Sequence, residues 1–270
     1  MLCARVIWRN CMQYEADRGY LIVAGITDGV DYISCAETLA KSLKYWHPDV
    51  KICLVTDHEN YANPLFDYVR QFPQGNTGGW STDWQVFYAS PFHETVKLEA
   101  DMVVSGPIDH WWPLYRNKPV WISTGARDFH GTTSTVRHYR KIFDHNNLPD
   151  VYNAITYWRV SPDAQRFFNN VKQCFEDWDK IKLNIKLGSD EIANTDLIYA
   201  LNGSDFVTPG TGPQIVHMKP RILGTSADDW AKELTWEVDD GVLRINGHNQ
   251  HGFVHYHQKE LAQQLGQYYD

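Results

Sequence analysis

The sequence predicts an α/β fold in which a mixed, mostly parallel central sheet is flanked by helices. Two observations support this prediction. Residues 19–26 and 51–57 are apolar runs typical of buried strands, and residues 32–46 between them carry Leu39 and Leu43 at helical spacing. A strand, a helix and a second strand in this order imply parallel pairing through a right-handed crossover.

Composition narrows the class of protein. Hydrophobic residues make up 43% of the 270 residues and charged residues 21%, which is typical of a globular chain. The net charge of −8 argues against a general nucleic-acid coat protein, because phosphate affinity depends on Lys and Arg. The 11 Trp and 15 Tyr are numerous enough that we expect some rings to line a groove that stacks sugars or bases.

Cysteine usage and hydropathy predict where the protein works. The five cysteines form no CxxC pair, so we expect free thiols in a reducing cytoplasm. The longest apolar stretch near the start, residues 21–26, is too short for a signal-peptide core or for the roughly 20 residues of a membrane span. We therefore expect a cytoplasmic protein with no membrane partner.

The middle of the chain adds further elements. The Gly-rich residues 75–79 predict a mobile loop, after which Ser81 is expected to cap a helix to Tyr88. Residues 94–104 predict one central strand interrupted by two acids, and residues 119–124 predict another strand.

The second half continues in the same pattern. Residues 153–160 predict a strand, and Ser161-Pro162 opens a helix to about Lys180 with Pro in its first turn. A helix is expected over about 190–201. Two short apolar segments that each contain a His follow, at residues 215–218 and 253–256.

The triplet Glu99-Ala100-Asp101 is the most informative motif. A strand directs residues i and i+2 to one side, so both carboxylates are expected to point the same way. Two buried like charges are costly unless a positive partner lies beside them, and Mn²⁺ or Mg²⁺ prefers such oxygen ligands. The alternative is that the strand ends at Leu98 and the acids cap a solvated turn.

The carboxyl ends of the first strands predict the ligand-binding edge. Thr27, Asp28 and Asp57 follow these strands, and open α/β sheets bind ligands at this edge. Tyr32, where the first helix begins, and Ala100, between the acids, are further candidates for cofactor binding.

Residues 84–114 (WQVFYASPFHETVKLEADMVVSGPIDHWWPL) resemble the central stretch of glycosyltransferase family 8 and related GT-A enzymes. In that family two acids chelate the metal that bridges the nucleotide diphosphate. The resemblance implies this role for Glu99 and Asp101. Because this chain has Glu99 where the family has Asp, Asp101 is the stronger candidate.

Three later segments extend the resemblance in the expected order. Residues 152–155 are similar to the family's F-N-S/A-G strand, which implies that Asn153 faces the donor sugar, although Ile155 replaces the Gly. Residues 194–196 are similar to the D-Q helix start, which implies a sugar contact for Asp196. Residues 215–220 are similar to the I-H-…-K-P strand, which implies that His217 is the third metal ligand and that Lys219 holds the diphosphate.

The resemblance implies a single GT-A type (Rossmann-like) domain over residues 1–270. Its nucleotide-binding half is expected over about 20–120, and its acceptor-side half with the C-terminal strands over about 121–270. The implied activity is metal-dependent transfer of a sugar from a nucleotide-diphosphate sugar to a hydroxyl acceptor, with retention of configuration.

Several residues have alternative roles within this prediction. His255 is the second candidate for the imidazole ligand, behind His217. Arg127 is expected to add positive charge beside the diphosphate, and Lys97 to orient the nucleoside. Asp190 is a second candidate for contacts to the sugar, and its alternative role is a solvated helix N-terminus.

The acceptor is predicted only through a basic segment. Residues 123–141 concentrate Arg, Lys and His in an otherwise acidic chain, which is compatible with phosphate contacts or with a solvated basic helix. The chain also resembles putative glycosyltransferases of tailed bacteriophages, some of which modify hydroxymethylated bases of viral DNA. Such DNA is one candidate acceptor, and the host cytoplasm would then be the location.

Two other function classes compete with this hypothesis. One is a metal-dependent nucleotidyltransferase or phosphoesterase that uses the same acids, although residues 24–29 are a poor phosphate loop. The other is a non-catalytic carbohydrate- or DNA-binding protein, which the Trp and Tyr content favours. The sequence indicates neither the donor sugar nor the oligomeric state.

Overall fold

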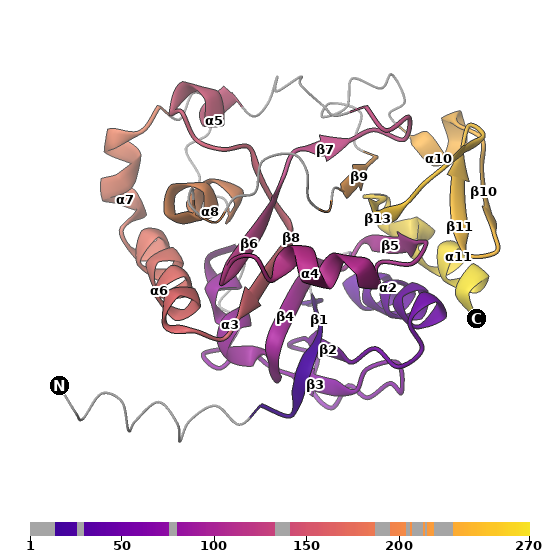
Figure 1. Cartoon of the computed structure of the whole chain (residues 1–270), viewed down its shortest axis with the longest axis horizontal. Helices are drawn as coiled ribbons and strands as arrows, with labels where there is room; N and C mark the ends of the chain where they lie inside the picture. Colours follow the sequence, from indigo (N-terminus) through magenta and orange to yellow (C-terminus); the bar gives the residue numbers. More distant parts are fainter. Residues whose placement is uncertain are drawn as a thin grey trace.

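A computed structural model describes residues 14–25, 30–75, 80–132, 141–186, 195–203, 206, 213, 215–218 and 229–270. Its centre is a six-stranded sheet with the order β3-β2-β1-β4-β8-β6 (Figure 1). Strands β3, β2, β1 and β4 pair in parallel, and β8 runs antiparallel to both β4 and β6. The predicted mixed, mostly parallel sheet is therefore confirmed. Its strands are β1 (Ala16–Val23), β2 (Ile52–Val55), β3 (Tyr68–Arg70), β4 (Phe92–Glu99), β6 (Val120–Thr124) and β8 (Val151–Arg159).

A smaller four-stranded sheet has the order β5-β13-β9-β7, and a three-stranded antiparallel sheet has the order β10-β11-β12. The four-stranded sheet joins distant parts of the chain, since β13 pairs with β5 on one side and with β9 on the other. These strands are β5 (Met102–Ser105), β7 (Ala126–Arg127), β9 (Ile215–His217), β10 (Trp236–Asp239), β11 (Val242–Ile245), β12 (His248–Asn249) and β13 (Gly252–His255).

Helices cover the central sheet on both faces, with α2 on the side of β5 and α6 and α8 on the other (Figure 1). The N-terminus of α2 is capped by Asp31 and that of α6 by Ser161, whose hydroxyl accepts from the amide of Ala164 at 3.2 Å. The α-helices are α2 (Tyr32–Trp46), α3 (Val86–Ala89), α4 (Trp112–Tyr115), α5 (Lys141–His145), α6 (Pro162–Glu176), α7 (Trp178–Ile181), α8 (Thr195–Gly203), α10 (Trp230–Glu233) and α11 (Ala262–Gly266). Short 3₁₀ segments are η2 (Trp80–Gln85), η3 (Asp109–Trp111), η4 (Lys182–Asn184), η6 (Lys259–Leu261) and η7 (Gln267–Tyr269).

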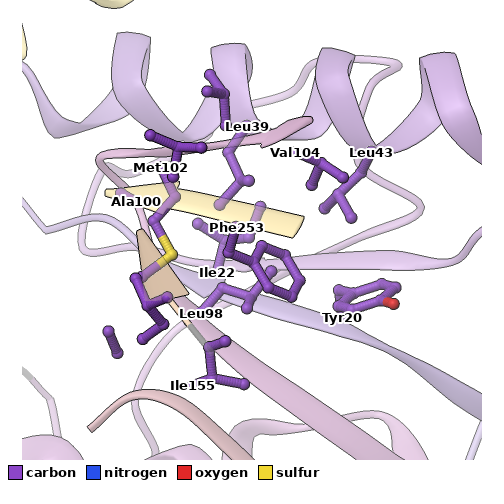
Figure 2. Packing of buried hydrophobic residues seen from close by; sticks show 14 of the residues in the cluster. Tyr20, Ile22, Leu39, Leu43, Leu98, Ala100, Met102, Val104, Ile155 and Phe253 are labelled. Atoms are coloured by element: carbon purple, nitrogen blue, oxygen red, sulfur yellow. The ribbon is translucent and has the colours of Figure 1, made fainter. Parts of the chain in front are cut away.

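Strand alternation builds a core on each face of the sheet. Tyr20 and Ile22 of β1 lie in one buried cluster with Leu39 and Leu43 of α2 (Figure 2), whereas Leu21 belongs to the cluster on the opposite face. Each such buried side chain contributes about 1.5–3 kcal/mol relative to an exposed one. These two cores hold the carboxyl ends of the parallel strands in a fixed position.

The prediction of one strand over residues 94–104 was wrong. The chain bends at Ala100 and Asp101, so that β4 ends at Glu99 in the central sheet and β5 begins at Met102 in the smaller sheet. The two acids therefore lie at a junction between sheets and not within one strand. This junction is the feature that brings residues of the smaller sheet next to Glu99.

Other expectations had mixed outcomes. The helix expected from Ser81 to Tyr88 begins as the 3₁₀ segment η2, and the helix expected to reach Lys180 is interrupted at Asp177. Most described Trp side chains are buried in the core. Burial raises the pKa of the Cys35 thiol to about 11, which keeps that thiol protonated and unreactive. Within the described residues, no helix is both long and apolar enough to span a bilayer.

Candidate active site

The candidate site lies where β4, β5 and β13 meet. Glu99 is the last residue of β4, and Asp101 occupies the bend before β5. The antiparallel pairing of β5 with β13 sets His255 opposite Met102, and the Tyr256 amide donates to the Asp101 carbonyl oxygen at 3.1 Å. The backbone thus fixes His255 beside the two acids.

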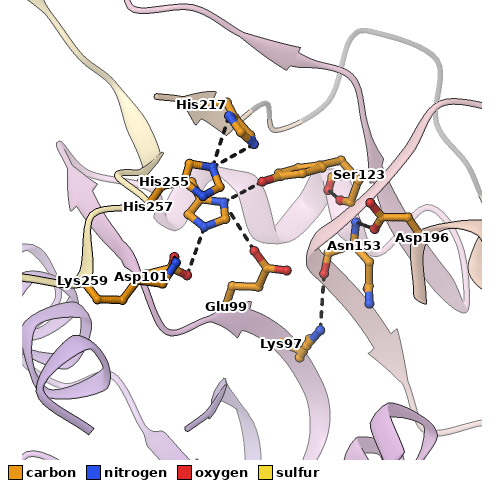
Figure 3. Close-up of polar contacts among 11 residues, drawn as sticks. Lys97, Glu99, Asp101, Ser123, Asn153, Asp196, His217, His255, His257 and Lys259 are labelled. Carbon is orange, nitrogen blue, oxygen red and sulfur yellow. Dashed lines mark hydrogen bonds and ion pairs between the residues drawn. The ribbon is translucent and has the colours of Figure 1, made fainter. Parts of the chain in front are cut away.

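The imidazole of His255 contacts both acids (Figure 3). Its Nε2 lies 3.0 Å from Asp101 Oδ1, and its Nδ1 lies 3.3 Å from Glu99 Oε2. The second oxygen of Asp101 pairs with Lys259 Nζ at 2.9 Å. The two carboxylates therefore approach different nitrogens of one imidazole, and the side chains of Asp101 and His255 are almost fully buried there.

The charges in this cluster shift one another's pKa values. Burial raises the pKa of Glu99 above its ordinary value, and the charge of His255 offsets this only in part. Burial opposes the charge on Asp101 as well, but His255 and Lys259 hold its pKa well below the ordinary value. The acids in turn outweigh burial and raise the pKa of His255. The cluster thus stabilises positive charge between its carboxylates.

The donor atoms fit a divalent cation. One ligand atom each from Glu99, Asp101 and His255 lies within 4.8 Å of the others. Neighbouring ligands of an octahedral ion with bonds of about 2.1 Å are about 3.0 Å apart, which the Asp101–His255 distance matches. The Tyr152 hydroxyl lies 2.6 Å from His255 Nδ1, and such a second partner orients a metal-binding imidazole.

A polar network borders the acids on the side of β8 and α8. Asp196 Oδ1 accepts from the backbone amide of Asn153 at 2.7 Å, which links the first turn of α8 to β8. Asp83 Oδ2 accepts from the Asn153 side chain at 3.3 Å and from the Tyr199 hydroxyl at 2.5 Å. The buried Lys97 ammonium pairs with Asp83 Oδ1 at 3.1 Å. Asn153 and Asp196, both predicted site residues, are therefore in direct contact.

The two candidate imidazoles occupy different positions. His217 and His255 are paired residues on the adjacent parallel strands β9 and β13. Of the two, His255 contacts both acids, whereas the ring nitrogens of His217 lie 2.9 and 3.2 Å from His257 Nε2. The geometry favours His255 as the ligand that accompanies the acids.

The remaining predicted residues lie around this centre or outside the described part of the chain. Tyr32 begins α2, and its ring centroid is 5.8 Å from Lys259 Nζ. Ala100 is buried in the bend, and the half-buried Asp57 follows β2 at the same sheet edge. The Arg127 guanidinium donates to the His251 carbonyl oxygen at 2.6 Å, at the end of β13 away from His255. The residues outside the described ranges are Thr27, Asp28, Asp190 and Lys219.

Sequence reasoning missed three residues of the site, namely Lys259, Tyr152 as an imidazole partner, and Asp83. Lys259 follows the candidate imidazole His255 by four residues, and this proximity in sequence was the available signal. Asp83 and Tyr152 carried no local signal, because their roles depend on contacts between distant segments.

Comparison with known proteins identifies the fold. No family model and no curated protein match the sequence. The structure is similar to the galactosyltransferase LgtC, solved with donor and acceptor sugar analogues, with a TM-score of 0.52 and 12% identity over 92% of this chain and 95% of LgtC. It is also similar to the glycosyltransferase GlyE of Streptococcus pneumoniae TIGR4, with a TM-score of 0.52 and 12% identity over 93% of this chain and 61% of GlyE. The fold is therefore GT-A, and the resemblance to family 8, to which LgtC belongs, is confirmed at the level of fold.

Proposed function

From this shared fold we propose that the chain is a metal-dependent glycosyltransferase that uses a nucleotide-diphosphate sugar. The observation that carries the proposal is the convergence of Glu99, Asp101 and His255 at the carboxyl edge of a GT-A sheet. Ligands bind at this edge in open α/β sheets. The proposal retains the single-domain division, with residues 20–120 facing the nucleotide and residues 121–270 facing the acceptor.

In this proposal Glu99, Asp101 and His255 hold Mn²⁺ or Mg²⁺. Two carboxylates and one imidazole suit these ions, and Mn²⁺ accepts the nitrogen more readily than Mg²⁺ does. When bound, the ion supplies positive charge that neutralises the diphosphate leaving group. The hydroxyl of Tyr152 keeps the His255 ring in one orientation, so that it can serve as a ligand.

Lys259 takes the role expected of a diphosphate-binding lysine. Its ammonium lies 2.9 Å from Asp101 and is half-buried, so it can reach a phosphate beside the ion without a large movement. Lys219, for which this role was expected, lies outside the described residues and stays a second candidate. A fixed positive charge at this point stabilises the charge that develops as the sugar bond breaks.

Asn153 and Asp196 are proposed to contact the donor sugar. Their mutual hydrogen bond and the link through Asp83 to Lys97 hold both side chains in place before the donor arrives. In this proposal Lys97 positions the Asn153 side chain through Asp83. The contact of Lys97 with the nucleoside, expected from the sequence, stays a prediction. Retention of configuration follows from the resemblance to family 8.

The acceptor is proposed to be a hydroxyl group, and a hydroxymethylated base of DNA is the candidate to test first. The basic segment behind this choice lies in part at residues 133–140, outside the described residues. Double-stranded oligonucleotides with and without hydroxymethylcytosine provide the assay. If sugar is transferred to neither oligonucleotide, DNA is excluded as the acceptor. The proposal for the donor site is not affected by that result.

The proposed function is tested by a thermal-shift screen of nucleotide sugars with and without Mn²⁺. A ligand at 100 times its Kd stabilises the native state by about 2.7 kcal/mol, which raises the Tm of a chain of this size by roughly 5 °C. We expect one donor to do so only with Mn²⁺, and incubation to release the nucleoside diphosphate. Release of monophosphate or pyrophosphate would instead indicate a phosphoesterase or nucleotidyltransferase. Binding that persists in EDTA would favour a non-catalytic protein.

A further inference from the structure

Three histidines form a second cluster directly beside the acids. His217 and His255 are paired across β9 and β13, and His257 follows β13 by two residues. One ring nitrogen from each lies within 4.8 Å of the others. His257 Nε2 is 2.9 Å from His217 Nε2, and the rings of His255 and His257 stack with centroids 3.7 Å apart (Figure 3).

We infer that His217, His255 and His257 form a second, overlapping site for a nitrogen-preferring divalent cation, with Zn²⁺ as the probe that fits best. Imidazole suits Zn²⁺, Ni²⁺ and Cu²⁺, whereas the oxygen-rich acid cluster suits Mn²⁺ and Mg²⁺. Nitrogen ligands of tetrahedral zinc are about 3.3 Å apart, given Zn–N bonds of about 2.0–2.1 Å. The His217 and His257 nitrogens, 2.9 Å apart, are already near this spacing. The rings of His255 and His257 stack with 25° between their planes, so one of the two must turn to direct its nitrogen at an ion shared with His217.

The backbone of His257 supports a role for its side chain. Its φ of +61° lies in the left-handed region, which costs a residue with a Cβ roughly 1 kcal/mol or more and which Gly or Asn adopts more readily. The strained conformation holds the ring against the other two histidines. The left-handed backbone at His257 therefore costs some stability, and a ligand role of the ring would offset this cost.

The three histidines of the cluster differ in solvent exposure, and one of them is accessible to an ion from solution. His217 and His255 are buried, whereas His257 is half-buried. An ion can thus enter from the side of His257, and a water molecule or a substrate group can complete a fourth position there.

The two sites share one residue. His255 Nε2 faces Asp101, and Nδ1 faces both Glu99 and the Tyr152 hydroxyl, so the ring must leave its partners at one nitrogen to join His217 and His257 around an ion. A neutral imidazole coordinates one ion at a time. Zinc at the three histidines is therefore expected to displace Mn²⁺ from the acids, a consequence for activity that rests on the proposed function.

The binding test uses the full chain treated with EDTA, titrated with Co²⁺ and Zn²⁺. The visible absorption of Co²⁺ reports nitrogen ligands in a tetrahedral site, and elemental analysis gives the zinc stoichiometry. His257→Asn removes one ligand with a residue that tolerates positive φ, and His130→Asn is the matched control at an exposed histidine outside the cluster. We expect the wild type and His130→Asn to bind one Zn²⁺, and His257→Asn to bind it at least about tenfold more weakly.

The Asp101→Asn variant distinguishes the zinc site at the three histidines from the site at the two acids. We expect this variant to keep the zinc site, because Asp101 is not among its three ligands. Equal zinc affinity of His257→Asn and the wild type would overturn the inference, as would zinc binding that is lost in Asp101→Asn and kept in His257→Asn. Neither result would affect the proposed transferase activity.

The activity test is independent of the binding test. With Mn²⁺ alone, His257→Asn is expected to transfer sugar at the wild-type rate, while Zn²⁺ inhibits the wild type in competition with Mn²⁺ and no longer inhibits the variant. Equal inhibition of both proteins would contradict the shared-ligand argument. Absence of transfer by the wild type with every donor would instead count against the proposed function and leave the zinc titration valid.

Discussion

The Asp101→Asn substitution distinguishes whether Asp101 is a metal ligand or an ordinary buried acid. Asp101 pairs with His255 at 3.0 Å and with Lys259 at 2.9 Å. At an effective dielectric constant of about 20, each pair interacts by about 5.5 kcal/mol, and the cost of removing the carboxylate from water offsets most of this sum. We expect the metal-free variant to lose about 3 kcal/mol of unfolding free energy, which lowers its Tm by roughly 6 °C or more.

Scanning calorimetry with and without Mn²⁺ measures both effects of this substitution. Mn²⁺ should raise the Tm of the wild type and leave that of Asp101→Asn unchanged. Transfer should fall at least about 10³-fold, because the ion contributes several kcal/mol to the transition state. Asp179→Asn, at a side chain that is 89% exposed, is the matched control and should leave the Tm close to that of the wild type. Stabilisation of the Asp101→Asn variant by Mn²⁺ to the same extent as the wild type would refute this reasoning.

The remaining predictions concern three further residues. The pKa of His255 is raised above 6.5, the ordinary pKa of histidine. The ion pairs of His255 therefore contribute their full stability below about pH 6.5, and this contribution is lost as the pH rises through the raised pKa of His255. Mn²⁺ needs the neutral ring, so the Tm increase with Mn²⁺ should grow over the same range, and an increase that falls with pH would contradict this. Lys259→Met should weaken binding of nucleoside diphosphate about tenfold or more in calorimetric titration while Mn²⁺ binding persists; loss of Mn²⁺ binding would assign Lys259 another role. Ser161→Ala removes the cap of α6 and should cost about 1 kcal/mol by chemical denaturation with transfer unchanged, so a neutral effect would show that the cap contributes little.

The sequence predicted the central sheet because its strands carry their own signals. Strand β2 is a short apolar run, and β1 begins three residues before the predicted run at 19–26 and ends within it, at Val23. Helix α2 begins and ends where helical spacing and Pro48 indicated. The bend at Ala100 was not predicted, since Val96 and Leu98 before the acids and residues 102–104 after them are alike apolar and buried. The local pattern cannot show that β4 and β5 belong to different sheets.

The candidate site was predictable in its acids but not in its imidazole. Glu99 and Asp101 are two residues apart in sequence and interrupt an apolar run, which is a local signal. His217 and His255 end paired strands, and the pairing of β13 with β5 decides which ring faces the acids. That pairing joins segments far apart in the chain, and no periodicity in a single sequence reports it.

The central claim is that Glu99, Asp101 and His255 together bind one catalytic divalent cation. Crystals grown with Mn²⁺ and a nucleoside diphosphate, measured at the manganese absorption edge, test it most directly. We predict one anomalous peak bounded by these three side chains and by the diphosphate oxygens. A peak elsewhere, or a diphosphate bound at this edge with no ion beside Asp101, would contradict the account.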